Sequence, residues 1–210
     1  MNSIEQLEWR YATKKFDKNK KLSTYQIDTL KKGFNLTATS YGLQPLKLIV
    51  ISNDLLKNDL LEHSFYQTQI VDCSHLLVLC IKTVIDGDYV DDKFDLEKEV
   101  RDVSEEVVGG FRTFLKDTIN KRPKEEIENS SINQAHIALG NLMTLCAFEK
   151  IDSCPMEGFI AQKFDEILDL KKQNLKSVLL LPVGFRANDD FMSSLKKVRI
   201  PVEESVIEIK

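Results

Sequence analysis

The hydrophobic positions near the N-terminus recur at the spacing of two amphipathic helices. A capping box at residues 3–6 begins the first helix, which we expect to end near residues 11–14. A second capping box lies at residues 23–26, and apolar residues on both sides of it form a hydrophobic staple. This pattern predicts a second helix that continues to about residue 34.

Three further hydrophobic runs are short and continuous, which is typical of buried strands. They lie at residues 46–52, 76–83 and 177–183. The first is followed by a predicted helix from residue 54 to about residue 64, and another short helix is predicted at residues 160–170. The longest apolar run, residues 177–185, is far below the roughly 20 residues that a membrane helix needs, so no membrane partner is expected.

The longest helical patterns lie between the second and third predicted strands. Residues 131–150 are apolar almost all round, which predicts a helix in the middle of a core. An excursion at about 85–130 is highly charged with one apolar edge, and we expect Gly109–Gly110 to loosen its helix. The β-branched tail at 202–210 predicts an exposed strand that needs a partner edge. Together these elements indicate a single α+β domain over residues 1–210.

Composition and charge remove several classes of function. The chain carries 29 Lys and Arg against 33 Asp and Glu, a net charge of −4, whereas proteins that bind duplex nucleic acid normally carry a basic excess. The four cysteines include no CxxC pair and the three histidines no HExxH motif, so we expect reduced thiols and no metal site. His75 and His136 are expected to be hydrogen-bonded core histidines. No segment resembles a signal peptide, which predicts a cytoplasmic protein.

The motifs of phosphate-binding glycine loops and serine hydrolases are missing, which leaves basic residues at the two ends of the chain. Arg10 and Lys14 close the first predicted helix, and Lys197 and Arg199 lie near the C-terminus. Singly, such residues usually form a solvated surface. Together they could bind one phosphate through charge-assisted hydrogen bonds, provided that the two ends meet. The segment 155–159 is either an ordinary turn or a rigid backbone whose N–H groups face a ligand.

Five segments resemble, in order and separation, a known family of flavoenzymes. They are RYATKKFD at 10–17, TSYGLQP at 39–45, QIVDCSHLLVL at 69–79, IALGNLMTLCAFEKIDSCPMEGF at 137–159 and LKKVRIP at 195–201. They closely resemble the FMN-dependent, oxygen-insensitive NAD(P)H nitroreductase family, in the branch that also carries the dihydropteridine reductase name. The resemblance covers nearly the whole chain and is weak only in the excursion.

The resemblance implies an intimate α+β homodimer with a central sheet flanked by helices. The helix at 131–150 would lie between the subunits, and the C-terminal strand would be exchanged into the sheet of the second subunit. Two FMN molecules would sit at the interface, so that a monomer has no complete site.

The resemblance also assigns a role to individual residues, but no catalytic side chain, because N5 of the flavin carries the chemistry. The implied cofactor-binding residues are Arg10, Tyr11, Ala12, Lys14, Thr39, Ser40, Gln69, Pro155, Met156, Glu157, Gly158, Lys197 and Arg199. Thr39 and Ser40 would reach the flavin from the second subunit, and a backbone N–H near Glu157 would face N5. The implied substrate-binding residues are Lys14, Tyr41, Tyr66 and Phe114.

The implied activity is transfer of a hydride from NADH or NADPH, through FMN, to nitroaromatics, quinones or similar small acceptors in a ping-pong sequence. Family members commonly carry Ser at Ala12, Asn and Lys at Tyr66 and Gln69, and Ser or Thr at Tyr41, so the substrate preference is left open. These departures keep an alternative, a non-redox FMN-binding or flavin-handling protein on the same fold. Nucleic-acid binding rests only on the basic pairs and is opposed by the net charge.

Overall fold

The computed structural model describes residues 2–210 and is built around a four-stranded antiparallel sheet. The strand order is β1, β2, β4, β3, with β1 at Leu46–Ile51, β2 at His75–Lys82, β4 at Leu175–Gly184 and β3 at Asp152–Ser153. The three strands predicted from continuous apolar runs are confirmed. The short edge strand β3 was not predicted, because two residues leave no periodic signal.

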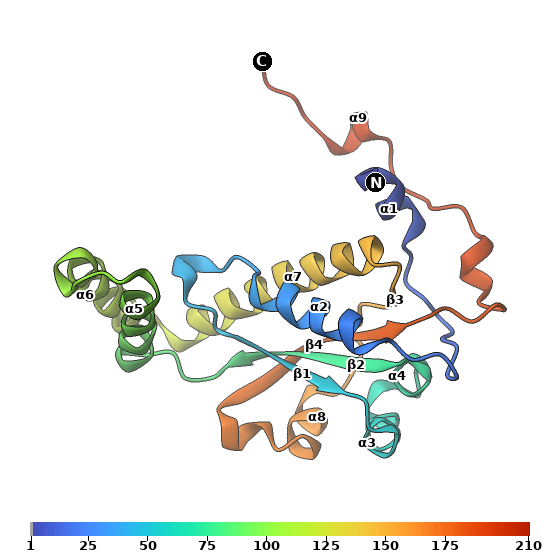
Figure 1. Cartoon of the computed structure of the whole chain (residues 1–210), viewed down its shortest axis with the longest axis horizontal. Coiled ribbons are helices and arrows are strands. Elements are labelled where there is room, and N and C mark those ends of the chain that lie inside the picture. Colours follow the sequence, from blue (N-terminus) through green and yellow to red (C-terminus); the bar gives the residue numbers. More distant parts are fainter. Residues whose placement is uncertain (1) are drawn as a thin grey trace.

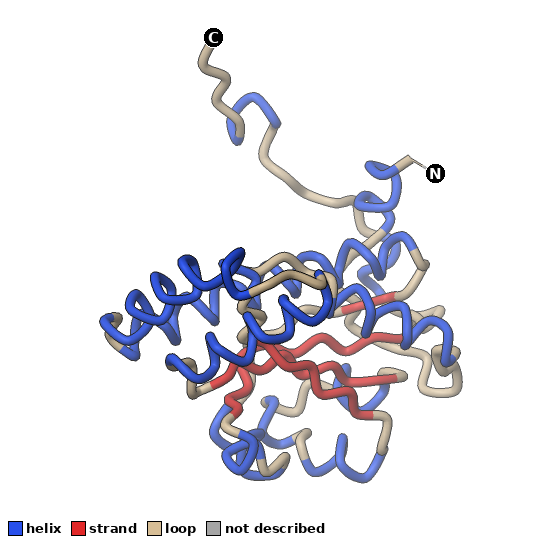
Figure 2. Tube along the Cα trace, turned by 60° about the vertical axis from the view of Figure 1, so that its left-hand side comes forward, coloured by secondary structure: helices blue, strands red, loops and turns tan. Residues whose placement is uncertain are grey.

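Helices cover both faces of this sheet and also form a lobe at one end of it (Figure 1). They are α1 (Ser3–Trp9), α2 (Thr24–Asn35), α3 (Asp54–Asp59), α4 (Gln69–Asp72), α5 (Gly87–Arg101), α6 (Glu105–Lys121), α7 (Lys124–Phe148), α8 (Ala161–Ile167) and α9 (Val202–Ser205). Figure 2 shows the sheet between the α2–α7 layer above it and the α3, α4 and α8 layer below it.

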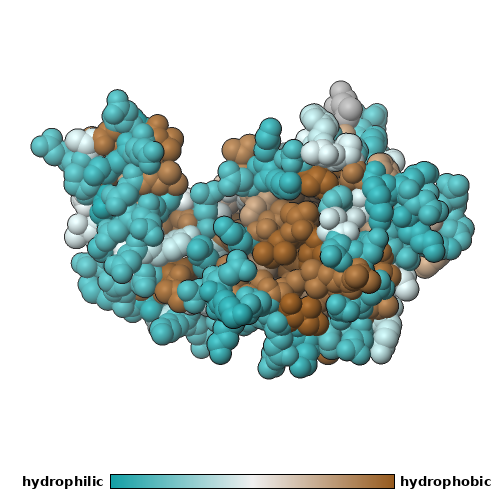
Figure 3. Space-filling view, turned by 60° about the horizontal axis from the view of Figure 1, so that its bottom comes forward, coloured by the Kyte–Doolittle hydropathy of each residue, from teal (hydrophilic) through white to brown (hydrophobic). Residues whose placement is uncertain are grey.

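Alternation along the central strand divides the core in two. Leu77, Leu79 and Ile81 of β2 point into the cluster shared with α2 and α7. Leu76 and Val78 join the cluster between the sheet and α8. A third cluster holds α5 and α6 together in the lobe. Because β2 contributes to the clusters on both sides of the sheet, both of its faces are buried, which explains why it carries a continuous apolar run. On the surface, Figure 3 shows hydrophobic residues gathered in the middle of the lower face, among mostly hydrophilic residues.

The predicted helix starts are mostly correct, but several ends differ. The capping box at Ser23 is present, with Gln26 bonding back, and α2 follows it. The first helix ends at Trp9 rather than at 11–14, because residues after it leave the helix to lie beside β3. α7 begins at Lys124, directly after Pro123, which is seven residues before the predicted start at residue 131.

The charged excursion contains two helices. α5 ends at Arg101, the next residue, Asp102, adopts a left-handed backbone conformation, and α6 then returns along α5. The prediction that Gly109–Gly110 loosens the helix is wrong, since α6 runs through both glycines without a break. Packing of Phe94 against Val108 and Leu115 explains the difference, because tertiary contacts outweigh the roughly 1 kcal/mol penalty of each glycine.

The C-terminal tail is not a strand in this chain. Residues 202–205 form one turn of helix, α9, and the following residues pair with no strand within the described part of the chain. The tail extends away from the body in Figure 1, and its apolar residues, among them Ile207 and Ile209, are exposed. The predicted strand is wrong for a single copy, because the tail leads away from the sheet and its β-branched residues reach no strand to pair with. Exchange into a second subunit stays a prediction.

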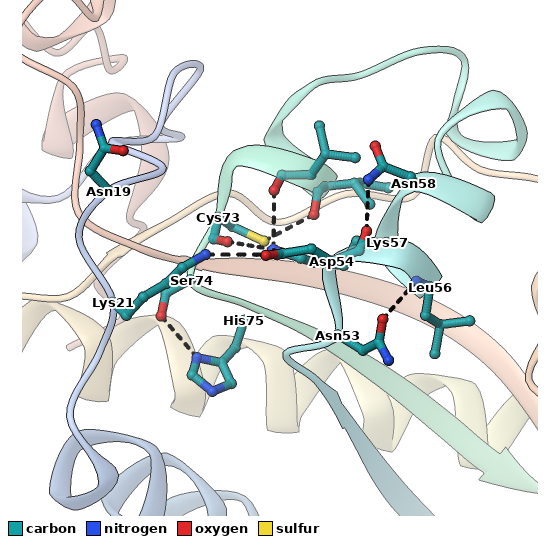
Figure 4. A network of polar contacts seen from close by, with 12 residues as sticks. Asn19, Lys21, Asn53, Asp54, Leu56, Lys57, Asn58, Cys73, Ser74 and His75 are labelled. Carbon is teal, nitrogen blue, oxygen red and sulfur yellow. Dashed lines mark hydrogen bonds and ion pairs between the residues drawn. The ribbon is translucent and has the colours of Figure 1, made fainter.

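A fully buried lysine joins α3 to the end of α4. The Lys57 side chain is 0% exposed, and its ammonium donates to the carbonyl oxygens of Val71 at 3.0 Å and Cys73 at 2.8 Å. It also pairs with the carboxylate of Asp54 at 2.9 Å, so its charge is balanced (Figure 4). The last carbonyls of α4 thus find a charged donor, and α4 in turn begins with Gln69.

Replacing Lys57 with methionine should lower the free energy of unfolding by about 2 kcal/mol. The aliphatic packing is kept, but two buried carbonyls lose their donor. Urea unfolding measures the change. The matched control is Lys21→Met, which removes the exposed second lysine beside Asp54, 3.7 Å away, and should change stability by less than about 0.5 kcal/mol. Equal losses in both variants would contradict the role assigned to the buried ammonium.

Candidate functional site

The segment that follows α1 runs along the edge of the sheet. Ala12 forms a bridge with Ser153 of β3, and the Thr13 N–H donates to the Ser153 carbonyl at 3.2 Å. Four residues on, Phe16 bridges Arg186 just beyond β4 and is buried. Residues 10–16 are therefore fixed as an extended segment beside β3, which places the side chains of the first sequence motif at this edge.

A buried carboxylate fastens the C-terminal segment to the same edge. Asp190 is 2% exposed. Its Oδ2 accepts hydrogen bonds from the Tyr11 hydroxyl at 3.0 Å, the Lys14 N–H at 3.0 Å and the Lys15 N–H at 3.3 Å. Its Oδ1 accepts from the Met192 N–H at 3.1 Å and so begins the 3₁₀ turn that follows. Sequence reasoning missed Asp190, whose only local signal is an aspartate in the capping position of a short turn.

Three cations from the two ends of the chain meet here, and we call Arg10, Lys197 and Arg199 the cation cluster. The Lys197 ammonium donates to the backbone carbonyl of Arg10. Burial and then the charge of Arg199 lower the pKa of Arg10, while burial and then the charges of Arg10 and Arg199 lower the pKa of Lys197. Because each cation disfavours the others, the cluster is a site of concentrated positive potential.

No carboxylate forms an ion pair with the cation cluster in the described residues, although the charge of Glu8 acts on Lys197. Within residues 2–210, no ion pair involves any of its three members. The Nε of Arg10 is buried and has no hydrogen-bond partner in this part of the chain. An unpartnered buried donor among unpaired cations is the arrangement that an anion would complete. The meeting of the two ends, on which the sequence interpretation depends, is therefore present.

The segment 155–158, which we call the ring segment, lies beside this edge as rigid extended backbone. Met156 is buried and exchanges two hydrogen bonds with Leu180 of β4, at 2.9 and 3.0 Å. The Gly158 carbonyl accepts from the Gln67 side chain at 2.9 Å. Between these fixed points, the Glu157 N–H donates to no acceptor in the described residues. The segment thus has the fixed backbone and the free N–H that the second interpretation of the sequence requires, and the ligand itself stays a prediction.

Other predicted residues border the ring segment. Burial raises the pKa of Cys154, which directly precedes Pro155, and the charge of Lys14 opposes this increase, so Lys14 lies near this end of the segment. Gln67 connects the ring segment to the residues between Tyr66 and the start of α4 at Gln69. Gln69 is buried, whereas Tyr66 is exposed and has a left-handed backbone. The structure thus gathers the predicted residues of the first, third and last motifs on one edge.

The remaining predicted residues lie elsewhere in the same chain. The Ser40 N–H donates to the Gln134 side chain at 2.8 Å, in the first half of α7. Arg10, in contrast, lies near Cys146, at the other end of that helix. Twelve helical residues span about 18 Å, so one chain does not bring Thr39, Ser40 and Tyr41 to the cation cluster.

Phe114, the last of the predicted substrate-binding residues, lies in the lobe, in an aromatic group near Tyr41. The rings of Tyr41 and Phe111 have centroids 6.0 Å apart, and Phe111 stacks on Phe114 at 6.0 Å. All three side chains are partly exposed. They form an apolar surface at the lobe, at the opposite end of α7 from the cations (Figure 1).

The cysteines are core thiols as predicted, whereas His136 differs from its prediction. All four cysteines are buried and unpaired, and burial raises the pKa of Cys73, Cys80 and Cys146 to about 12, as expected of core thiols. The prediction that His136 is a core residue is wrong. Its side chain is 46% exposed and its Nε2 lies 3.1 Å from the Glu157 carboxylate, because the helical period turns position 136 away from the sheet.

No helix in residues 2–210 is both long and apolar enough to cross a membrane. No group of three or more histidine, cysteine and acidic side chains in the same residues could hold a metal ion.

Comparison with known proteins agrees on one family. The sequence model of the nitroreductase family matches residues 7–185. The oxygen-insensitive NAD(P)H nitroreductase of Salmonella typhimurium (strain LT2) is 29% identical over 95% of this chain and 96% of its own length. The major NAD(P)H-flavin oxidoreductase of Aliivibrio fischeri is 31% identical over 97% and 96%. A protein of Exiguobacterium sibiricum, solved in complex with FMN, superposes with a TM-score of 0.85 at 18% identity, covering 100% of this chain and 98% of that one, which shows the shared fold.

Proposed function

This chain belongs to the nitroreductase family, and from that premise we propose that it is an FMN-dependent oxidoreductase that takes electrons from NADH or NADPH. The observation that carries the proposal is the cation cluster, in which Arg10, Lys197 and Arg199 meet without an ion-paired carboxylate in the described residues. A phosphate monoester carries roughly −1.5 to −2 charges at neutral pH and would balance this charge. The enzyme would act in the cytoplasm, on acceptors such as nitroaromatics or quinones.

The cation cluster suits the phosphate end of FMN. At about 4 Å, each cation contributes about 1 kcal/mol in water-like surroundings and about 4 kcal/mol near a protein surface. Arg10 is half-buried, and its orphaned Nε would gain an acceptor. Because Asp190 holds the two chain ends together, the phosphate would meet preformed donors rather than order them.

The ring segment suits the other end of the cofactor. FMN, when bound, supplies hydride exchange at N5 of its ring. The free N–H of Glu157 would donate to the ring at that atom, and the rigid backbone around it would set the ring's position. Lys14, near the same segment, would stabilise negative charge that develops on the reduced ring.

We propose a homodimer, because the substrate side of the pocket is split between the two ends of α7. The face of α7 between them is open: Ile137 is 56% exposed, and a Cβ added at Gly140 would meet nothing within 4 Å. A second copy packed on this face would carry its own Thr39, Ser40 and Tyr41 toward the first copy's ring segment. Phe114 would then cover the exposed side of the ring.

Purified protein should bind FMN and sediment as a dimer. In the absence of oxygen, NADH or NADPH should bleach the absorption of the bound flavin, and a nitroaromatic or quinone added afterwards should restore it. Tight FMN binding without bleaching by either nicotinamide would favour the alternative of a non-redox flavin-handling protein. Failure to bind FMN at all would overturn the proposal.

A further inference from the structure

Both ring nitrogens of His136 face hydrogen-bond acceptors. Nδ1 lies 3.0 Å from the backbone oxygen of Ile132, and Nε2 lies 3.1 Å from Oε1 of Glu157. A neutral imidazole has one donor and one acceptor nitrogen, whereas the imidazolium donates from both. With Glu157 ionised, the two contacts can form together only when His136 is positively charged. The pair is therefore an imidazolium–carboxylate bridge.

This bridge joins α7 to the middle of the ring segment. The bond to Ile132 fixes the imidazole on its own helix, one turn back. Met156 and Gly158 are each held by other hydrogen bonds. The Glu157 side chain is 75% exposed, and His136 is its one hydrogen-bonding partner among residues 2–210. The Glu157 backbone carbonyl accepts from the Phe159 N–H at 3.0 Å, so the imidazolium is the restraint on its side chain.

We propose that His136 is a positioning residue: as an imidazolium it holds Glu157, and with it the ring segment, in the conformation that binds the flavin ring. This inference rests on the proposed function, because it presumes that FMN occupies the site. It adds a protonation-dependent element on α7 that none of the five sequence motifs assigns to flavin binding.

The dependence on pH has a definite sign. The hydrogen bond to Ile132 and then the one to Glu157 raise the pKa of His136 above its ordinary value of 6.5. Glu157 is the charged group that faces it from the ring segment, and α7 contributes the Ile132 carbonyl. For a histidine whose pKa is raised by folding, the interaction is complete below pH 6.5 and is lost as the pH rises through the raised value. FMN binding should therefore weaken as the pH rises through the raised pKa of His136.

The first measurement needs no flavin. The chain has three histidines, so NMR titration of histidine-labelled apoprotein can assign each ring with single His→Gln variants. His136 should titrate above pH 6.5, and its pKa should fall toward 6.5 in Glu157→Gln. A pKa at or below 6.5 that is unaffected by Glu157→Gln would overturn the bridge, whatever the protein does with FMN.

The second measurement is the dissociation constant of FMN between pH 6 and pH 9, from quenching of flavin fluorescence. In the wild type it should rise about 3- to 10-fold across the titration of His136, as expected for loss of one charge-assisted hydrogen bond. His136→Gln should show the weaker value throughout, and His136→Lys, which keeps a cation, should remain tight without the step. Ionisation of the FMN phosphate near pH 6 affects all variants equally.

His63→Gln is the matched control, because His63 also lies beside a glutamate, 3.2 Å from Glu62. It should retain the step. A step that persists in His136→Gln, while FMN still binds, would overturn the positioning role and leave the proposed function intact. An apoprotein in which the pKa of His136 depends on Glu157 but which binds no FMN would overturn both the positioning role and the proposed function. The NMR result would still establish the bridge itself.

Discussion

Replacing Arg10 with methionine should weaken FMN binding by about 10- to 100-fold, while the flavin-free protein stays at least as stable as the wild type. The expected loss follows from the removal of a half-buried, charge-assisted donor whose Nε lacks any other partner in the described chain. Stability is kept because methionine retains the apolar packing and because one of three mutually repelling cations is removed. Fluorescence titration with FMN and thermal unfolding of the apoprotein measure the two effects.

Two further variants test whether position, rather than charge alone, explains that loss. Arg199→Ala should weaken FMN retention in the same direction and leave the dimer intact. Lys196→Ala, which removes the neighbouring cation outside the cluster, should change the dissociation constant by less than about 2-fold, because exposed charges are screened by solvent and salt. Equal losses in Lys196→Ala and Arg10→Met would show that FMN responds only to net charge and that the phosphate site is misplaced.

Replacing Asp190 with alanine should lower the free energy of unfolding by about 3 kcal/mol and also abolish tight FMN binding. The Tyr11 hydroxyl and the N–H groups of Lys14 and Lys15 would lose a shared, buried acceptor. Since the same carboxylate joins residues 11–15 to the segment before Lys197, its removal should also release the cation cluster. Urea unfolding and FMN titration of one preparation measure both effects.

Tyr11→Phe separates the two roles of Asp190. It removes one of the three hydrogen bonds to Oδ2, so it should cost about 1 kcal/mol and leave most of the FMN affinity. If Asp190→Ala unfolds at the urea concentration of the wild type and binds FMN normally, the carboxylate does not hold the chain ends together. If it fails to fold, Asp190→Asn, which keeps Oδ1 for the Met192 N–H, provides the test.

The centre of the sheet could be predicted from the sequence because β2 and β4 are mostly buried on both faces. Residues 76–81 alternate between two hydrophobic clusters, so nearly every position is apolar and the run is unmistakable. The start of α7 at Lys124 was missed because its first turns are charged and solvated. The tail after Pro201 was predicted as a strand from composition alone, yet strand formation also requires a neighbouring strand, and the tail of one copy reaches none.

The site was predictable only in its parts. The basic residues of both chain ends are visible in the sequence, but their meeting depends on hydrogen bonds between residues 176 positions apart, from the Lys14 N–H to Asp190. No local pattern contains such a contact. The exposure of His136 was missed for a related reason: apolar neighbours along the sequence indicated a core, while the helical turn directs this one side chain to the ring segment.

The repulsion within the cation cluster also has a consequence for the lifetime of the protein in a cell. A ligand that binds only the folded chain stabilises it by about 2.7 kcal/mol when its concentration is 100 times the dissociation constant. The empty chain lacks this stabilisation and also holds three like charges together at the junction of its ends. Copies made when FMN is scarce should therefore open more often at this junction and be degraded sooner, so that the amount of enzyme follows the supply of its cofactor.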